Sequence, residues 1–274
     1  MLWNDQGRSS NLEDKRGSGM GGRMGMGLGG SAVLLVLSLL FGRNLFDDVA
    51  AVAPTTANEG GRLSPADSAR EEPEVRFVSY VLDDVQSTWK RIAPQYRDAH
   101  LVVYRDATQT GCGVGQSAMG PFYCPLDQKV YIDLGFYEEL KSKFGAQGDF
   151  AQAYVIAHEL GHHVQHLSGT DAQVRRAQQG DPGASNEYSV RLELQADCYA
   201  GVWAHSTQQR NILQAGDVDE AMTAAASVGD DRIQTRTKGR VSPESFTHGT
   251  SAQRTSWFKK GLDTGDPKSC DTFQ

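Results

Sequence analysis

His158-Glu159-Leu160-Gly161-His162 is the most informative stretch of this 274-residue chain. It lies in a segment, 149–167, whose apolar residues recur at helical spacing and which ends before Gly169. Residues four apart share one face of a helix, so the two histidines can hold one metal ion. Glu159 then lies beside the metal, where a carboxylate can take a proton from a metal-bound water and pass it to a leaving amine. The alternative is an ordinary helix with surface histidines.

A third ligand has to come from elsewhere, because catalytic zinc normally has three protein ligands and a water. Residues 191–197 place Glu193 and Asp197 four apart among apolar residues, where carboxylates are costly unless they are paired or bind metal. We assign Glu193 as the third ligand and Asp197 as an acceptor that orients the ring of His158 or His162. Two alternatives remain, namely Asp197 on the zinc and a plain salt bridge between helices.

An N-terminal membrane anchor is expected at residues 24–46. Residues 24–42 carry no charge and their second half is mostly Val and Leu, which is long enough for one transmembrane helix. Four basic residues precede this stretch, so the positive-inside rule keeps residues 1–23 in the cytoplasm and the bulk of the chain outside. The alternatives are a cleaved signal peptide ending at Ala51-Val52-Ala53 and a buried core helix.

The remaining chain divides into a stalk and a folded domain. Residues 47–72 mix small, polar and charged residues without an apolar period, as a flexible stalk does, whereas residues 73–274 are patterned throughout. We expect helices at 75–89, 149–167 with Asp149 as N-cap, 187–205, 218–233 and from Thr250 with a capping box to Gln253; strands at 101–104 and 129–134; and a loop at 108–124. The domain is therefore α+β and mostly helical with a small sheet.

The chain resembles the neutral zinc metallopeptidases of bacteria, a family that is anchored by one N-terminal membrane span. The resemblance covers most of the chain except the stalk, and it rests on GRSSNLED at 7–14, TQTGCG at 108–113, GPFYCP at 120–125, HELGHHVQ at 158–165, ELQAD at 193–197 and THGTSAQR at 247–254. It implies a zincin-like fold. The Glu-x-x-x-Asp pair looks like that of the gluzincin group, in which the Glu binds zinc.

His248 is the preferred candidate for stabilising the oxyanion that forms when hydroxide adds to a peptide carbonyl. It lies in a short Thr/Gly turn just before a helix, and zincins commonly supply a neutral or cationic donor. The other candidates are Tyr188, Tyr131 and Arg254. The alternative for His248 is a solvent-exposed loop histidine.

Four cysteines allow three pairings. Cys112 and Cys124 bracket a Gly- and Pro-rich loop, whereas Cys198 directly follows Asp197 and Cys270 lies near the C-terminus. We expect the disulfides Cys112–Cys124 and Cys198–Cys270, which only an oxidising compartment preserves and which agree with the expected topology. Free buried thiols are the alternative.

Charge and motif together define the expected function. The 27 basic and 34 acidic residues form no basic stripe, so nucleic acid is not expected as a partner. We expect a zinc-dependent endopeptidase, with Zn²⁺ as cofactor and Glu159 as general base, that acts on peptides or proteins from the periplasmic or extracellular side of the cytoplasmic membrane. A non-catalytic, membrane-anchored interaction module with a structural zinc is the main alternative, although such a site would not need Glu159. A third hypothesis is that the protein stores or delivers zinc.

Overall fold

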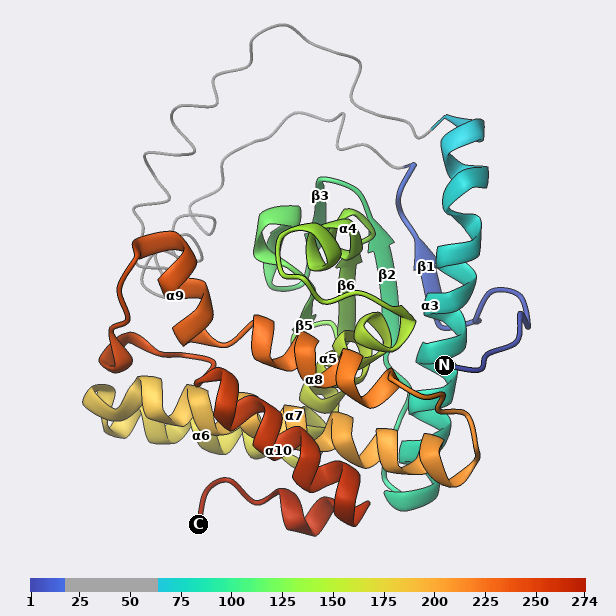
Figure 1. Cartoon of the computed structure of the whole chain (residues 1–274). Helices are drawn as coiled ribbons and strands as arrows, with labels where there is room; N and C mark the ends of the chain where they lie inside the picture. The colour runs from blue at the N-terminus through green and yellow to red at the C-terminus, as the bar shows by residue number, and fades with distance from the viewer. Residues whose placement is uncertain (18–63) are drawn as a thin grey trace, which may run out of the picture.

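A computed structural model describes residues 1–17 and 64–274, and most of them are helical (Figure 1). The α-helices are α3 (Pro65–Ile92), α4 (Gly135–Ser142), α5 (Asp149–Ser168), α6 (Thr170–Gly180), α7 (Ser185–Gln209), α8 (Asp217–Ser227), α9 (Asp230–Lys238) and α10 (Ser251–Thr264). Short 3₁₀ turns are η1 (Ser117–Met119), η2 (Pro182–Ala184), η3 (Pro243–Ser245) and η4 (Pro267–Cys270).

The strands form two small sheets. They are β1 (Leu12–Asp14), β2 (His100–Tyr104), β3 (Ala107–Thr110), β4 (Gly113–Gln116), β5 (Phe122–Cys124) and β6 (Lys129–Asp133). The main sheet has the order β1-β2-β6-β5, in which β5 alone is antiparallel to its neighbour, and β3 and β4 pair as an antiparallel hairpin. The predicted α+β class, mostly helical with a small sheet, is confirmed.

Most elements expected from periodicity are present, and the differences have local causes. The capping box between Thr250 and Gln253 begins α10 as predicted. The helix expected at 218–233 is split into α8 and α9, because Gly229 adopts an extended backbone with φ −70° and ψ 141°. The N-cap of α5 is Gly148 rather than Asp149. The loop expected at 108–124 contains β3, β4 and β5, whose glycines and small polar residues hide any alternation of apolar side chains.

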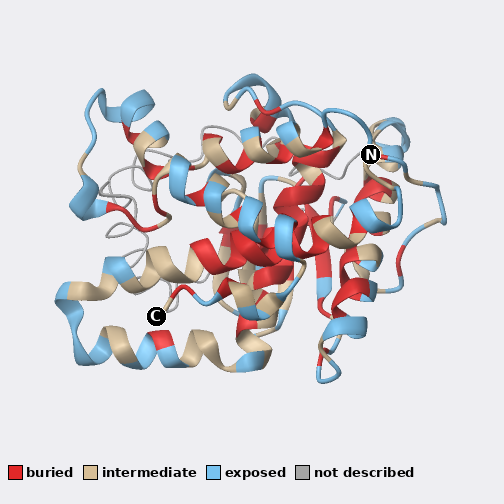
Figure 2. Ribbon diagram, turned by 60° about the horizontal axis from the view of Figure 1, so that its bottom comes forward, coloured by how far each residue is buried: buried red, intermediate tan, exposed pale blue. Residues whose placement is uncertain are grey.

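Both faces of the main sheet are covered. Alternate residues of β2 and β6 on one face, Leu101, Val103, Val130 and Ile132, belong to the same core as α3 and α5. The opposite face carries a smaller cluster with Val102, Tyr104 and Tyr131. Buried residues gather in the middle of the molecule in Figure 2, and α5 is buried along most of its length. The metal-binding motif predicted on α5 therefore lies on the central helix of the fold.

Helices α7 and α10 pack backbone to backbone. A Cβ atom on Gly201 would overlap the Phe258 carbonyl oxygen, and one on Gly261 would overlap the Cys198 carbonyl oxygen. Disulfide Cys198–Cys270 joins the same two helices through η4, and Cys112–Cys124 joins the β3–β4 turn to β5. Both predicted disulfides are confirmed, and one of them, together with the two glycines, fixes α10 against α7.

The N-terminal residues are part of this domain. β1 pairs in parallel with β2 over all three of its residues, and the buried Arg16 side chain forms an ion pair with Glu71 of α3 at 3.0 Å. Strands that share a ladder of hydrogen bonds lie on the same side of a membrane. The structure therefore places residues 1–17, which were predicted as part of a separate cytoplasmic segment, in the same domain as residues 64–274.

The predicted stalk also changes at its end. Residues 65–72 are the first two turns of α3, which Ser64 caps by accepting the backbone N–H of Asp67 and in which Pro65 occupies the first turn. These turns lack an apolar period because they are held by ion pairs such as that of Glu71 with Arg16. Residues 47–63 lie outside the described part of the chain.

The predicted transmembrane helix, residues 24–46, also lies outside the described residues. None of the helices within 1–17 and 64–274 is both long enough and apolar enough to cross a bilayer.

Replacing Gly261 with alanine is expected to lower the free energy of unfolding by about 1–3 kcal/mol, because the methyl group overlaps the α7 backbone. Gly180→Ala is the matched control. Gly180 lies in the last turn of α6, and no atom lies within 4 Å of the place that a methyl group would occupy there, so alanine is expected to be neutral or to stabilise by up to about 1 kcal/mol. Urea unfolding measures both, and equal stability of the two variants would contradict the close crossing.

Single cysteines at Gln6 and Leu126 are expected to report the same side of the membrane. Both positions are exposed, and β1 holds the first of them in the domain that contains the second. A membrane-impermeant maleimide should label Gln6→Cys and Leu126→Cys alike in intact cells, with permeabilised cells as the measure of total reactivity. Labelling of only one of the two would show that residues 1–17 are not part of the domain.

Candidate metal centre

Helices α5 and α7 cross where α5 has no side chain. A Cβ atom on Gly161 would lie 3.1 Å from the carbonyl oxygen of Ala196 and 3.2 Å from its Cα, closer than side chains normally approach. The crossing lies within one turn of both motif histidines on α5 and of Glu193 and Asp197 on α7. The glycine inside the motif thus lets two acidic residues of another helix approach the histidines.

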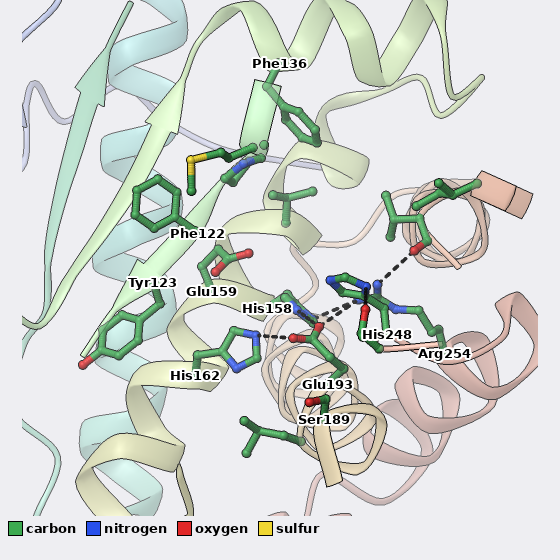
Figure 3. A pocket seen from close by; sticks show the side chains of 18 of the residues that line it. Phe122, Tyr123, Phe136, His158, Glu159, His162, Ser189, Glu193, His248 and Arg254 are labelled. Atoms are coloured by element: carbon green, nitrogen blue, oxygen red, sulfur yellow. Dashed lines mark hydrogen bonds and ion pairs between the residues drawn. The ribbon is translucent and has the colours of Figure 1, made fainter. Parts of the chain in front are cut away.

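The side chains of His158, His162 and Glu193 converge beside this crossing (Figure 3). Nε2 of His158 lies 3.2 Å from Oε2 of Glu193, and Nε2 of His162 lies 3.5 Å from Oε1. One potential ligand atom from each residue lies within 4.8 Å of the other two. Two imidazoles and one carboxylate are a donor set that catalytic zinc takes, so these residues fit the ion that the sequence predicts.

The second nitrogen of each ring is held by a neighbour. Nδ1 of His158 lies 2.9 Å from Oδ1 of Asp197, and Nδ1 of His162 lies 2.8 Å from Oε1 of Gln165. With Nδ1–H donating to these oxygens, each ring keeps its lone pair on Nε2, the atom that faces Glu193. Of the two rings that Asp197 was expected to orient, it contacts that of His158.

The two carboxylates of α7 are compensated by a buried cation. The Arg254 guanidinium of α10 donates to both oxygens of Asp197, at 2.8 and 2.9 Å, and the Tyr154 hydroxyl donates to Asp197 at 2.5 Å. Burial alone would raise the pKa of Asp197, but Arg254 and His158 hold it below its usual value. Burial acts on Glu193 in the same way, and the imidazoles of His162 and His158 hold the pKa of that carboxyl well below its usual value.

Glu159 opens onto a cleft of about 800 Å³ that the site shares. Its side chain extends from α5 into the cavity beside the two histidines (Figure 3). The residue is 8% exposed, yet its carboxylate makes no hydrogen bond or ion pair with any residue in the described parts of the chain. A carboxylate that faces a cleft without a partner is available to accept a proton from a group bound there.

His248 lines the cleft on the opposite side from Glu159 (Figure 3). Nδ1 of its ring lies 3.3 Å from Oδ1 of Asp230, and the other oxygen of Asp230 accepts the backbone N–H groups of Thr247 and His248 at 2.7 and 2.6 Å. Burial alone would lower the pKa of His248, but Asp230 and Glu193 raise it above its usual value. Asp230 therefore fixes the turn and favours the charged form of the ring.

The other predicted oxyanion donors are engaged elsewhere. The Tyr131 hydroxyl donates to Asp127 at 2.7 Å, Tyr188 lines a separate cavity between α6, α7 and the C-terminal residues, and Arg254 is held by Asp197. His248 lines the cleft and keeps one ring nitrogen, Nε2, without a partner in the described residues.

A second group of acids lies apart from the site. Asp149, Asp217 and Glu220 gather at the starts of α5 and α8. The amino group of Met1 lies 2.6 Å from Asp149 and 3.2 Å from Asp217, so an ammonium group already compensates these carboxylates.

Sequence reasoning missed three supporting residues. Gln165 follows His162 by three positions on the same helix, so helical spacing could have indicated its contact with the ring. Asp230 and Tyr154 carry no such signal, because each meets its partner only through the packing of α9 or α5 against other elements. The sequence indicates Arg254 only as an oxyanion donor, whereas the structure pairs it with Asp197.

Comparisons with known proteins agree with this site. The family described as "Putative neutral zinc metallopeptidase" matches residues 1–273. The uncharacterized protein YpfJ of Escherichia coli K12 is 49% identical over all of this chain and 99% of its own length. The uncharacterized protein Rv2575 of Mycobacterium tuberculosis H37Rv is 48% identical over 202 residues, which are 70% of this chain and 68% of its own.

No solved structure matches the chain, so the zincin-like character of the fold stays a prediction. The family match, in contrast, includes β1, the convergent histidines and Glu193, and both disulfides. The chain therefore belongs to the neutral zinc metallopeptidase family.

Proposed function

We propose that the protein is a zinc-dependent endopeptidase that hydrolyses peptide bonds in its cleft. The observation that carries this proposal is Glu159, whose carboxylate faces the cleft without a partner among the described residues, next to three convergent potential ligands. A structural zinc site is closed by four protein ligands, whereas these three face an open cleft. The geometry therefore supports an enzyme better than a non-catalytic module with a structural zinc.

His158, His162 and Glu193 would hold the zinc ion. A bound zinc ion lowers the pKa of a coordinated water and polarises a substrate carbonyl. Asp197 and Gln165 keep the two rings in the orientation that presents Nε2, and Arg254 keeps Asp197 ionised, so the ligands are arranged before any ion binds.

Glu159 would move the proton. Its free carboxylate can accept a proton from the attacking water and deliver it to the amine that leaves, a role that requires an acceptor not already engaged in an ion pair. His248 would donate to the oxyanion from Nε2, because Asp230 holds the ring at Nδ1 and favours its charged form.

We propose further that residues 1–17 and 64–274 lie outside the cytoplasm, on the periplasmic or extracellular side. The two disulfides support this location, because they persist in oxidising compartments. The uncharged residues 24–42 support an association with the cytoplasmic membrane, and because the residues before and after them belong to one domain, this association would not be a single crossing of the membrane.

The purified protein is expected to hold one zinc ion per chain and to lose it in Glu193→Gln, because one of three ligands is removed. Asp197→Asn should weaken zinc binding by about 10- to 100-fold without abolishing it. Glu187→Gln, on an exposed turn of the same helix, is the control and should bind zinc normally. Elemental analysis and chelator competition measure all three. Normal zinc in Glu193→Gln together with its loss in Asp197→Asn would reverse the ligand assignment.

Glu159→Gln is expected to lower peptide hydrolysis by about 10²- to 10⁴-fold at unchanged zinc content, because the amide keeps the shape but cannot accept the proton. His248→Ala should lower turnover by a smaller factor, since it removes only an oxyanion donor. Rates are compared at equal zinc occupancy on a substrate selected from a peptide library. Equal rates of the parent and Glu159→Gln would favour the non-catalytic module.

A further inference from the structure

Large apolar side chains gather on one side of the proposed zinc site, where the charged Glu139, Lys143 and Arg236 also line the cleft. The large apolar residues on this side come from η1, β5, α4, the turn after α4, α5 and α9, namely Met119, Phe122, Phe136, Phe144, Val155 and Ile233. Figure 3 shows Phe122 and Phe136 on the same side of the site as Glu159, with His248 and Arg254 on the other. Toward α6 the lining is polar or charged, with Gln165, Asp171, Arg175 and Ser189.

Five of these six side chains are partly exposed, and Val155 is buried. The large hydrophobic residues exposed elsewhere in 1–17 and 64–274 are Leu2, Ile92, Leu126 and Val241, which lie on separate elements and do not line the cleft. Scattered apolar residues are normal on a protein surface, whereas a contiguous apolar surface inside a cleft marks a binding site.

The Phe122 ring, which forms one wall of the cleft, is held in place before any ligand binds. The Phe122 ring stacks on Tyr131, with centroids 5.1 Å apart and planes at 13°. Beneath it lies Gly115, where a Cβ atom would come within 2.8 Å of the ring, so the glycine leaves room for Phe122. Disulfide Cys112–Cys124 closes the loop that carries Phe122. A pocket whose walls are already ordered binds without the entropic cost of ordering them.

We infer that the pocket between Phe122 and Phe136 binds a large apolar side chain of the substrate, next to the bond that is cleaved and on one side of it only. This inference rests on the proposed peptidase activity and names the substrate class for the same cleft. The selectivity is one-sided because a peptide crossing the cleft meets charged or polar side chains at the α6 end. Full burial of a Phe or Leu side chain favours it over Ala by about 10- to 100-fold.

The inference is tested with blocked peptides, acetyl-Gly-Ala-Ala-Xaa-Ala-Ala-Gly-amide, in which Xaa is Phe, Leu, Ala or Asp. The zinc-loaded parent protein is expected to cleave the Phe and Leu peptides with a kcat/KM about 10- to 100-fold above that of the Ala peptide, and the Asp peptide most slowly. Mass spectrometry should find the cut always on the same side of Xaa. Equal values for Phe, Leu and Ala, or cuts on both sides of Xaa, would overturn the inference.

Variants of the wall locate the preference. Phe136→Ala is expected to reduce the ratio of kcat/KM for the Phe peptide over the Ala peptide by about 3- to 10-fold, since it removes one wall of the pocket. Leu126→Ala is the matched control, because Leu126 is 78% exposed and lies outside the cleft, so the ratio should stay at the parent value. If the Phe136→Ala protein folds and binds zinc normally but keeps the parent ratio of kcat/KM, the pocket beside Phe136 does not bind the apolar side chain and the inference is overturned.

Binding separates this inference from the proposed function. Calorimetry of the four peptides with Glu159→Gln protein is expected to give the same order, with the Phe peptide binding about 10- to 100-fold more tightly than the Ala peptide. This order in a protein whose parent cleaves no peptide would refute the peptidase and retain the apolar pocket. Cleavage by the parent, together with equal binding of all four peptides to Glu159→Gln, would support the peptidase activity and refute the apolar pocket.

Discussion

Two carboxylates lie at the crossing of α5 and α7, the buried Asp197 and the half-buried Glu193, and keeping both ionised is the constraint on which the site depends. A buried carboxylate is stable only beside compensating charge or hydrogen bonds. Arg254 supplies one such charge from α10, and the histidines of α5 supply further partners. Arg254 reaches this position because α10 packs on α7 through glycines and is fixed there by a disulfide. The packing of three helices and the chemistry of the site are thus parts of one arrangement.

Much of the site could be predicted from the sequence because its signals are local. The spacing of His158 and His162 and that of Glu193 and Asp197 each indicate one helix face, and the structure brings those faces together. The partners of these groups were harder to find. Asp230 holds His248 from eighteen positions earlier in the chain, and Arg254 reaches Asp197 from another helix, so no periodicity connects them. The hairpin of β3 and β4 was not predicted for a different reason, because its glycines and small polar residues show no alternation of apolar and polar side chains.

The structure departs from the predicted domain boundaries at residues 1–17 and 65–72, where short segments join the domain through a β ladder and ion pairs. β1 joins the domain through its ladder with β2 and through Leu12, which packs against the core, and the first turns of α3 join it through the ion pair of Glu71 with Arg16. The groups that support the site and the groups proposed to react differ in whether they have partners. His158, Asp197 and Arg254 are all paired, whereas Glu159 and one nitrogen of His248 face the cleft without a partner in the described residues. The groups that hold the ligands in place are thus hydrogen-bonded or ion-paired, whereas the groups proposed to react have no partner among the described residues.

The central claim is that one zinc ion binds between His158, His162 and Glu193. Crystals of the zinc-loaded protein, measured at the zinc absorption edge, test it most directly. The account predicts one strong anomalous peak about 2.0–2.2 Å from Nε2 of each histidine and from a Glu193 oxygen, with Asp197 still bound to Nδ1 of His158. A principal peak held by Asp149, Asp217 and Glu220, or a zinc ion coordinated by Asp197 in place of Glu193, would contradict it.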